Sequence, residues 1–115
     1  MKIIQKGFEL PSIDYYKTHF RIINAVLPIG MTEKEVEILS MFLSLHDGKT
    51  AIFNPVSRKR VMDILKLSQA GLSGHFKNMK IKKYLSAKEE DELTITPALL
   101  PDSTMQGYNF KLKKA

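Results

Sequence analysis

Basic side chains are concentrated in one stretch of the 115-residue chain, residues 57–83. This segment holds eight Lys and Arg residues against one acid, Asp63, which gives it a formal charge of +7, whereas the whole chain carries +6. Lysine and arginine bind phosphate oxygens through charge-assisted hydrogen bonds, so such a segment predicts contact with a polyanion. The eight residues are Arg58, Lys59, Arg60, Lys66, Lys77, Lys80, Lys82 and Lys83.

The residue types that support catalysis are scattered along the chain. His19 and His46 have no second histidine or carboxylate four residues on, the spacing that would pair two side chains on one helix face. Ser73 lacks the neighbouring histidine and acid that would mark it as a nucleophile. We therefore predict that the chain is not an enzyme and takes neither a metal nor a cofactor.

The remaining bulk features favour a cytoplasmic protein. The chain has no cysteine, so it forms no disulfide and offers no thiolate to a metal. No run of 18 apolar residues is present, and the start, MKIIQKGFELP, is too charged and too short for a signal peptide. We expect a location in the cytoplasm, of the protein's own cell or of an infected host, and no membrane partner.

Two short helices, 58–66 and 68–82, are predicted to carry the basic residues. Ser57 and Ser68 stand just before them, where a serine hydroxyl can accept a first-turn N–H. Apolar residues recur at helical spacing and define the inward faces. They are Val61, Ile64 and Leu65 in the first helix, and Leu72, Phe76 and Met79 in the second.

The flanking segments provide a scaffold. A helix over 12–27, capped by Ser12, has an apolar face of about half its circumference, which suits either the domain's own core or a second subunit. Thr32 and Glu35 form a capping box for a helix reaching His46, which is apolar on two sides and therefore central. Residues 1–10 read as a short strand or arm. Short strands are predicted at 51–53, 84–85, 93–96 and 108–112.

The stretch 67–85, LSQAGLSGHFKNMKIKKYL, resembles the recognition helix of winged helix-turn-helix regulators such as the MarR-like families. The matching residues are Leu67, Ser68, Leu72, Ser73, His75, Phe76, Met79 and Leu85. The resemblance implies one winged helix domain over 1–115, mainly α with a small β wing (α+β) and an extra N-terminal helix. Its parts would be an arm and helix over 1–30, a helical core over 32–83 with the helix-turn-helix at 57–83, and the wing over 84–115.

The resemblance also implies that the second helix of the motif enters the major groove of double-stranded DNA, while the first turn of the preceding helix contacts phosphate. The predicted contact residues are Arg58, Lys59, Arg60, Ser68, Gln69, Ser73, Lys77, Asn78, Lys80 and Lys82.

The sequence leaves two questions open: where the tip of the wing lies, and whether the protein forms a dimer. The acidic run 89–92 lies where a wing would start, so the wing tip is either there or at 100–107. A second copy of the chain could bind through the helix at 12–27.

The predicted function is sequence-preferring or non-specific binding of double-stranded DNA by a small transcriptional regulator, for which a phage is one candidate source. The alternative is a winged-helix adaptor in a replication, transcription or phage assembly complex, whose basic face meets an acidic protein. Gly71 and Gly74 on the groove face favour the adaptor, because glycine offers no side-chain atom to a base, and the +7 segment favours DNA.

Overall fold

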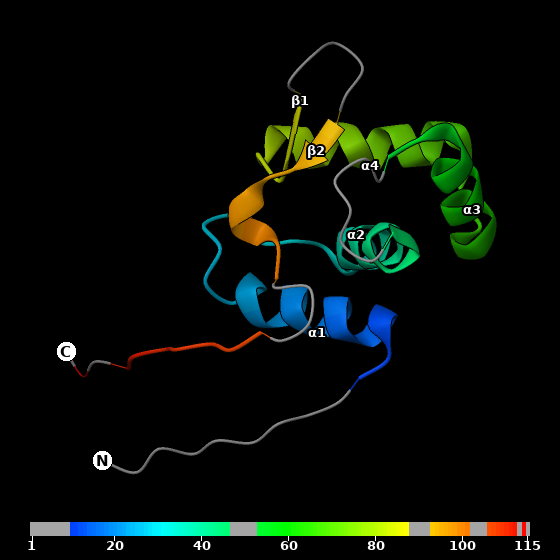
Figure 1. The fold of residues 1–115 in the computed structure, drawn as a ribbon. Helices are drawn as coiled ribbons and strands as arrows, with labels where there is room; N and C mark the ends of the chain where they lie inside the picture. Colours follow the sequence, from blue (N-terminus) through cyan, green and yellow to red (C-terminus); the bar gives the residue numbers. More distant parts are fainter. Residues whose placement is uncertain (1–9, 47–52, 88–92, 102–105, 113, 115) are drawn as a thin grey trace.

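The computed structural model describes residues 10–46, 53–87, 93–101, 106–112 and 114. Within them the chain is mainly helical, with one small antiparallel sheet, as the predicted α+β class requires (Figure 1). The elements in chain order are α1 (Ser12–Asn24), α2 (Glu33–His46), α3 (Pro55–Leu65), α4 (Gln69–Ile81), β1 (Leu85–Ala87), β2 (Leu93–Ile95) and the 3-10 helix η1 (Pro97–Leu99).

Helix α2 lies at the centre, between α1 on one side and α4 on the other (Figure 1). The sequence predicts this position from two apolar stripes, and both are buried. The buried residues of α2 include Val36, Leu39 and Leu43 on one stripe and Ile38 and Phe42 on the other. Burial of each such side chain contributes about 1.5–3 kcal/mol, so the centre of the molecule is held from both sides.

Two of the predicted helix starts are confirmed. Thr32 and Glu35 form the expected capping box: the Glu35 N–H donates to Thr32 Oγ1 at 3.1 Å, and the Thr32 N–H donates to Glu35 Oε1 at 2.8 Å. Ser68 caps α4, because its hydroxyl oxygen accepts the Gly71 N–H at 3.0 Å. Each bond satisfies an N–H that the helix itself leaves unpaired.

The cap predicted at Ser57 is wrong. Helix α3 begins at Pro55, and Asn54 is the cap, with its Oδ1 accepting the Ser57 N–H at 2.8 Å. Proline suits the first helical position because it has no N–H to leave unpaired. Ser57 therefore lies inside the helix and is buried. The predicted inward position of Ile64 is also wrong, since that side chain is 50% exposed.

Helix α1 differs from its prediction at both ends. Pro11 occupies the cap position without a side-chain bond, and Ser12 is the first helical residue. The helix ends at Asn24 rather than at residue 27, because the Asn24 side chain closes the following loop. Its Oδ1 accepts the Met31 N–H at 2.6 Å, and its Nδ2 donates to the Met31 carbonyl at 3.1 Å.

The two strands β1 and β2 pair antiparallel, with Leu85 opposite Ile95 and Ser86 opposite Thr94. Because β1 and β2 follow one another in the chain and pair antiparallel, the connection between them is 88–92, which holds the acidic run, and not 100–107; residues 88–92 themselves lie outside the described part. The strand predicted at 108–112 is not formed; this segment is extended and unpaired beside the body (Figure 1). Residues 1–9 and 51–52 lie outside the described residues, and Phe53 is in a turn.

Candidate nucleic-acid interface

Helix α4 has a buried face and an exposed face. Leu72, Phe76 and Met79 are buried as predicted, and they fix the helix against the core. The opposite side of the helix is exposed to solvent and, apart from Ile81 at its end, small or polar. It comprises Gln69, Ala70, Ser73, Gly74, Lys77, Asn78 and Lys80. A methyl group at Gly74 would meet no atom within 4 Å, so this part of the surface is open.

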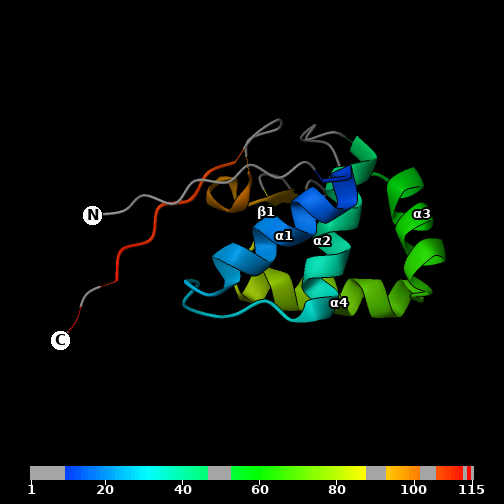
Figure 2. The same ribbon diagram turned by 90° about the horizontal axis from the view of Figure 1, so that it is seen from below.

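The turn between α3 and α4 is short. Lys66 ends α3 with left-handed backbone angles, φ 55° and ψ 46°, and the Leu67 N–H bonds back to the Met62 carbonyl at 2.9 Å. Ser68 then starts the next helix. The two helices consequently run in different directions from a common corner, as Figure 2 shows.

The three basic residues near the start of α3 do not share one environment. Lys59 and Arg60 are exposed. Arg58 is half-buried: its Nε donates to the Phe53 carbonyl at 2.8 Å, and its guanidinium lies 5.4 Å from the centroid of the Phe76 ring. Arg58 therefore helps to hold α3 against α4, and fewer of its donors remain for another partner.

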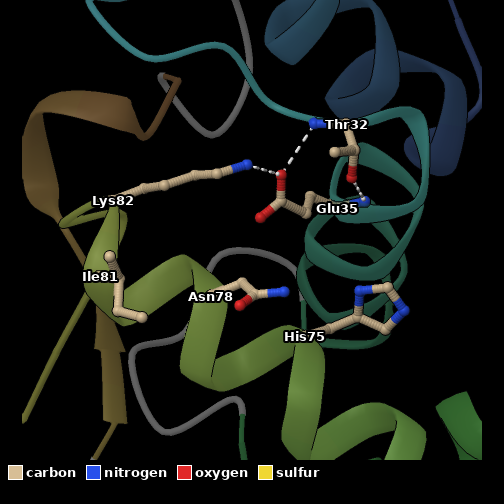
Figure 3. Close-up of a pocket in the computed structure, with 6 residues that line it drawn as sticks. All are labelled: Thr32, Glu35, His75, Asn78, Ile81 and Lys82. Atoms are coloured by element: carbon tan, nitrogen blue, oxygen red, sulfur yellow. Dashed lines mark hydrogen bonds and ion pairs between the residues drawn. The ribbon is translucent and has the colours of Figure 1, made fainter.

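Lys82 does not belong to the exposed basic surface. Its ammonium points at the start of α2, where Nζ lies 2.6 Å from Glu35 Oε1 (Figure 3). The same oxygen accepts the Thr32 N–H, so one carboxylate completes the capping box and binds the end of α4. Glu35 is only 1% exposed. The ammonium of Lys82, one of the predicted contact residues, is thus engaged in an internal ion pair.

A shallow pocket of about 200 Å³ adjoins this ion pair. Its lining includes His75 and Asn78 of α4, which stand across from Glu35 (Figure 3). Glu35 Oε2 is buried and has no hydrogen-bond partner among the described residues. Asn78 therefore lies where the exposed face of α4 meets the rim of this pocket.

Six basic side chains remain exposed on or beside α3 and α4. None of them forms an ion pair with another residue in the part of the chain that the structure describes. They are Lys59, Arg60, Lys66, Lys77, Lys80 and Lys83. Lys66 and Lys83 are not among the contact residues predicted from the sequence. Both have left-handed backbone angles, with φ of 55° and 65°. Residue type alone does not predict this conformation, and the sequence therefore does not predict where the two side chains lie.

His19 has a structural environment. It is buried, with Nε2 2.7 Å from the Leu99 carbonyl oxygen and Nδ1 2.6 Å from the Tyr108 hydroxyl. Burial lowers the pKa of His19, and the hydrogen bond to Leu99 offsets part of this effect. The side chain of His46 lies outside the described residues. Within the described ranges, no three His, Asp or Glu side chains gather closely enough to hold a metal ion.

The apolar face of α1 packs on the molecule's own core. Tyr16 and Phe20 are buried against α2, so this part of the face is not available to a second subunit. Val26, beyond the end of the helix, is exposed. The open choice between core and dimer interface is therefore resolved toward the core for the centre of α1.

No known protein family matches the sequence, and neither curated proteins nor solved structures give a match. None of the helices in the described ranges is long and apolar enough to cross a membrane. The function has to follow from the chemistry of the surface itself.

Proposed function

We propose that this protein has a winged helix-turn-helix arrangement and binds double-stranded DNA with the exposed face of α4 in the major groove. The observation that carries the proposal is the division of α4 into a buried apolar face and an open face of small and polar residues. A groove about 12 Å wide admits a helix whose outward side chains are short or can hydrogen-bond to base edges.

The charge supports the same partner. Lys77 and Lys80 lie on α4, and Lys59 and Arg60 lie in the first half of α3. All four side chains are exposed, so their charges are available to phosphates. In this proposal Arg58 and Lys82 act within the fold.

Recognition of sequence is expected to be modest. Gln69, Ser73, Lys77 and Asn78 are the side chains that can reach base edges, whereas Gly74 offers no atom to read a base. The hairpin is a poor phosphate contact at its tip, since residues 89–92 are all acidic. DNA shape or pairing of two half-sites would have to supply sharp specificity.

Such a protein would act as a small regulator in the cytoplasm of its own cell or of a host cell, and the proposal assigns it no reaction.

A protein–protein adaptor is the second candidate. It is favoured by exposed apolar residues beside the basic ones, namely Val56 and Ile64 on α3 and Ile81 at the end of α4. An acidic partner with an apolar centre would complement that mixture.

Fluorescence anisotropy with a labelled random duplex at about 50 mM salt separates the two candidates, because a DNA-binding protein shows clear non-specific binding there. We expect binding in the micromolar range, weakened about equally for all sequences by Arg60→Glu. The matched control is Lys17→Glu on α1, a helix that lies on the side of the molecule away from α4 (Figure 1); Lys17, like Arg60, forms no ion pair among the described residues. Absence of binding at tens of micromolar protein would leave the adaptor as the better candidate.

A further inference from the structure

The segment 106–112 extends from the body as an arm (Figure 1) and carries two aromatic residues, Tyr108 and Phe110. The rings of Tyr108 and Phe110 are stacked, with centroids 6.2 Å apart and planes within 5° of parallel. Phe110 is 54% exposed and Leu112 fully exposed. Alternate residues of an extended chain point to the same side, which explains the parallel rings.

The root of the arm is fixed to α1. The Tyr108 hydroxyl bonds to Nδ1 of the buried His19, and the His19 ring stacks on the Tyr108 ring with centroids 5.7 Å apart. Since His19 Nε2 lies 2.7 Å from the Leu99 carbonyl, which can only accept, Nε2 carries the proton and Nδ1 accepts from tyrosine. The aromatic stack therefore starts inside the protein at His19 and opens to solvent at Phe110.

We propose that this arm binds the unpaired bases of a single-stranded nucleic acid. The base stacks on the open ring of Phe110 beside Tyr108, while Lys111 and Lys114 contact the phosphates. Single-strand binding surfaces combine these two elements, because every base has a ring face and the backbone is anionic. The described part of the arm, 106–112 and 114, carries these two lysines and no acid, so its charge complements this partner.

The site is separate from the duplex-binding face. The arm leaves the molecule on the side of α1, whereas α4 lies on the opposite side of α2 (Figure 1). The inference does not rest on the duplex proposal, and either can fail alone. If both hold, the partner is a nucleic acid with adjoining double- and single-stranded parts.

The test compares two labelled oligomers of about 15 nucleotides, near the upper end of the roughly 4–16 nucleotides that single-strand binding domains cover, one of thymidines and one abasic. The two have the same backbone charge, so their difference reports stacking. At about 50 mM salt we expect the full chain to bind the thymidine oligomer about 10-fold more tightly than the abasic one. Phe110→Ala should abolish that difference, and Phe110→Trp should keep it. Leu112→Ala, an exposed apolar neighbour, is the matched control and should leave it unchanged.

Phe110→Trp also provides a direct reporter, because the chain contains no tryptophan. Its fluorescence should be quenched by the thymidine oligomer and not by the abasic one. Equal affinity for the two oligomers in the unmodified protein would overturn the proposal. Sedimentation without nucleic acid gives a second way to overturn it. If the unmodified protein is a dimer and Phe110→Ala is a monomer, the arm is a contact between protein chains. Binding of random duplex by Phe110→Ala, measured in parallel, reports on α4 independently.

Discussion

The two faces of α4 differ in what they contact and therefore in what they can do. The inner face places Phe76 and Met79 in the core, and Lys82, just past the helix end, binds the buried Glu35. The outer face leaves Lys77 and Asn78 in solvent. Lysines of the same helical segment consequently have different roles, and the difference is one of phase: positions 77 and 82 stand about 140° apart around a helix with 3.6 residues per turn. Stability and binding should be separable by mutation.

The largest effect is expected at the centre of the inner face. Phe76→Ala should lower the free energy of unfolding by about 3–5 kcal/mol, because it leaves a cavity beside the rings of Phe42 and Phe53. Denaturant unfolding measures this change. Phe110→Ala removes the same side chain at an exposed position and should change stability by less than about 0.5 kcal/mol. Similar losses for the two variants would contradict the assignment of Phe76 to the core.

The next effect concerns the two lysines. Lys82→Met should lower the free energy of unfolding by about 2 kcal/mol, because Glu35 is then buried without its cation. Lys80→Met, two residues earlier on the outer face, should leave stability within about 0.5 kcal/mol of the unmodified protein. Chemical denaturation of both variants under the same conditions compares them. Equal stability would show that the Lys82–Glu35 pair adds nothing to the fold.

Helix caps give a smaller difference between two serines. Ser68→Ala should destabilise by about 1 kcal/mol, because the Gly71 N–H loses its acceptor. Ser12→Ala should be close to neutral, since Pro11 and not Ser12 precedes α1 and alanine favours a helix interior. Thermal or urea unfolding resolves a gap of this size. A larger loss for Ser12→Ala would restore the serine cap that the sequence suggests.

The smallest effect is a pH dependence from His19. Its pKa is lowered in the folded protein, so below its ordinary value of 6.5 the unfolded chain takes up a proton that the folded chain does not. The contribution of neutral His19 to the free energy of unfolding is fully present above pH 6.5 and is lost as the pH falls through the pKa of the folded protein. The free energy of unfolding should therefore decrease between about pH 7.5 and 5, and His19→Gln should weaken that decrease. An identical pH profile for the variant would remove His19 as its source.

Local signals in the sequence predict much of the fold and less of the site. The capping box at Thr32 and the period of Leu72, Phe76 and Met79 depend on neighbours three or four residues away, so they are visible in the sequence. At the start of α3 the local pattern is ambiguous, because Asn54 and Ser57 are both residue types that cap helices and only Asn54 does so in the structure. The Lys82–Glu35 pair joins residues 47 positions apart, and such pairing depends on tertiary packing that no local pattern encodes.

The strand predicted at 108–112 shows the same limit. Alternation of apolar and polar residues correctly predicts an extended segment with side chains on two faces. It does not supply a partner strand, and the hydrogen bond between Tyr108 and His19, 89 positions apart, ties the segment to α1 instead of to the sheet. The extended conformation of 108–112 is predictable from the sequence, whereas its contact with α1 is not.

The salt dependence of duplex binding tests most directly whether the outer face of α4 and its basic neighbours bind DNA. If about five of the exposed cations contact phosphates, the logarithm of affinity should fall against the logarithm of salt concentration with a slope of about −4 to −5. Lys77→Gln should make that slope shallower by about 1, whereas Lys17→Gln on α1, with the same charge change, should leave it unaltered. A slope near zero, or an equal response to the two substitutions, would contradict the assignment of this face to DNA.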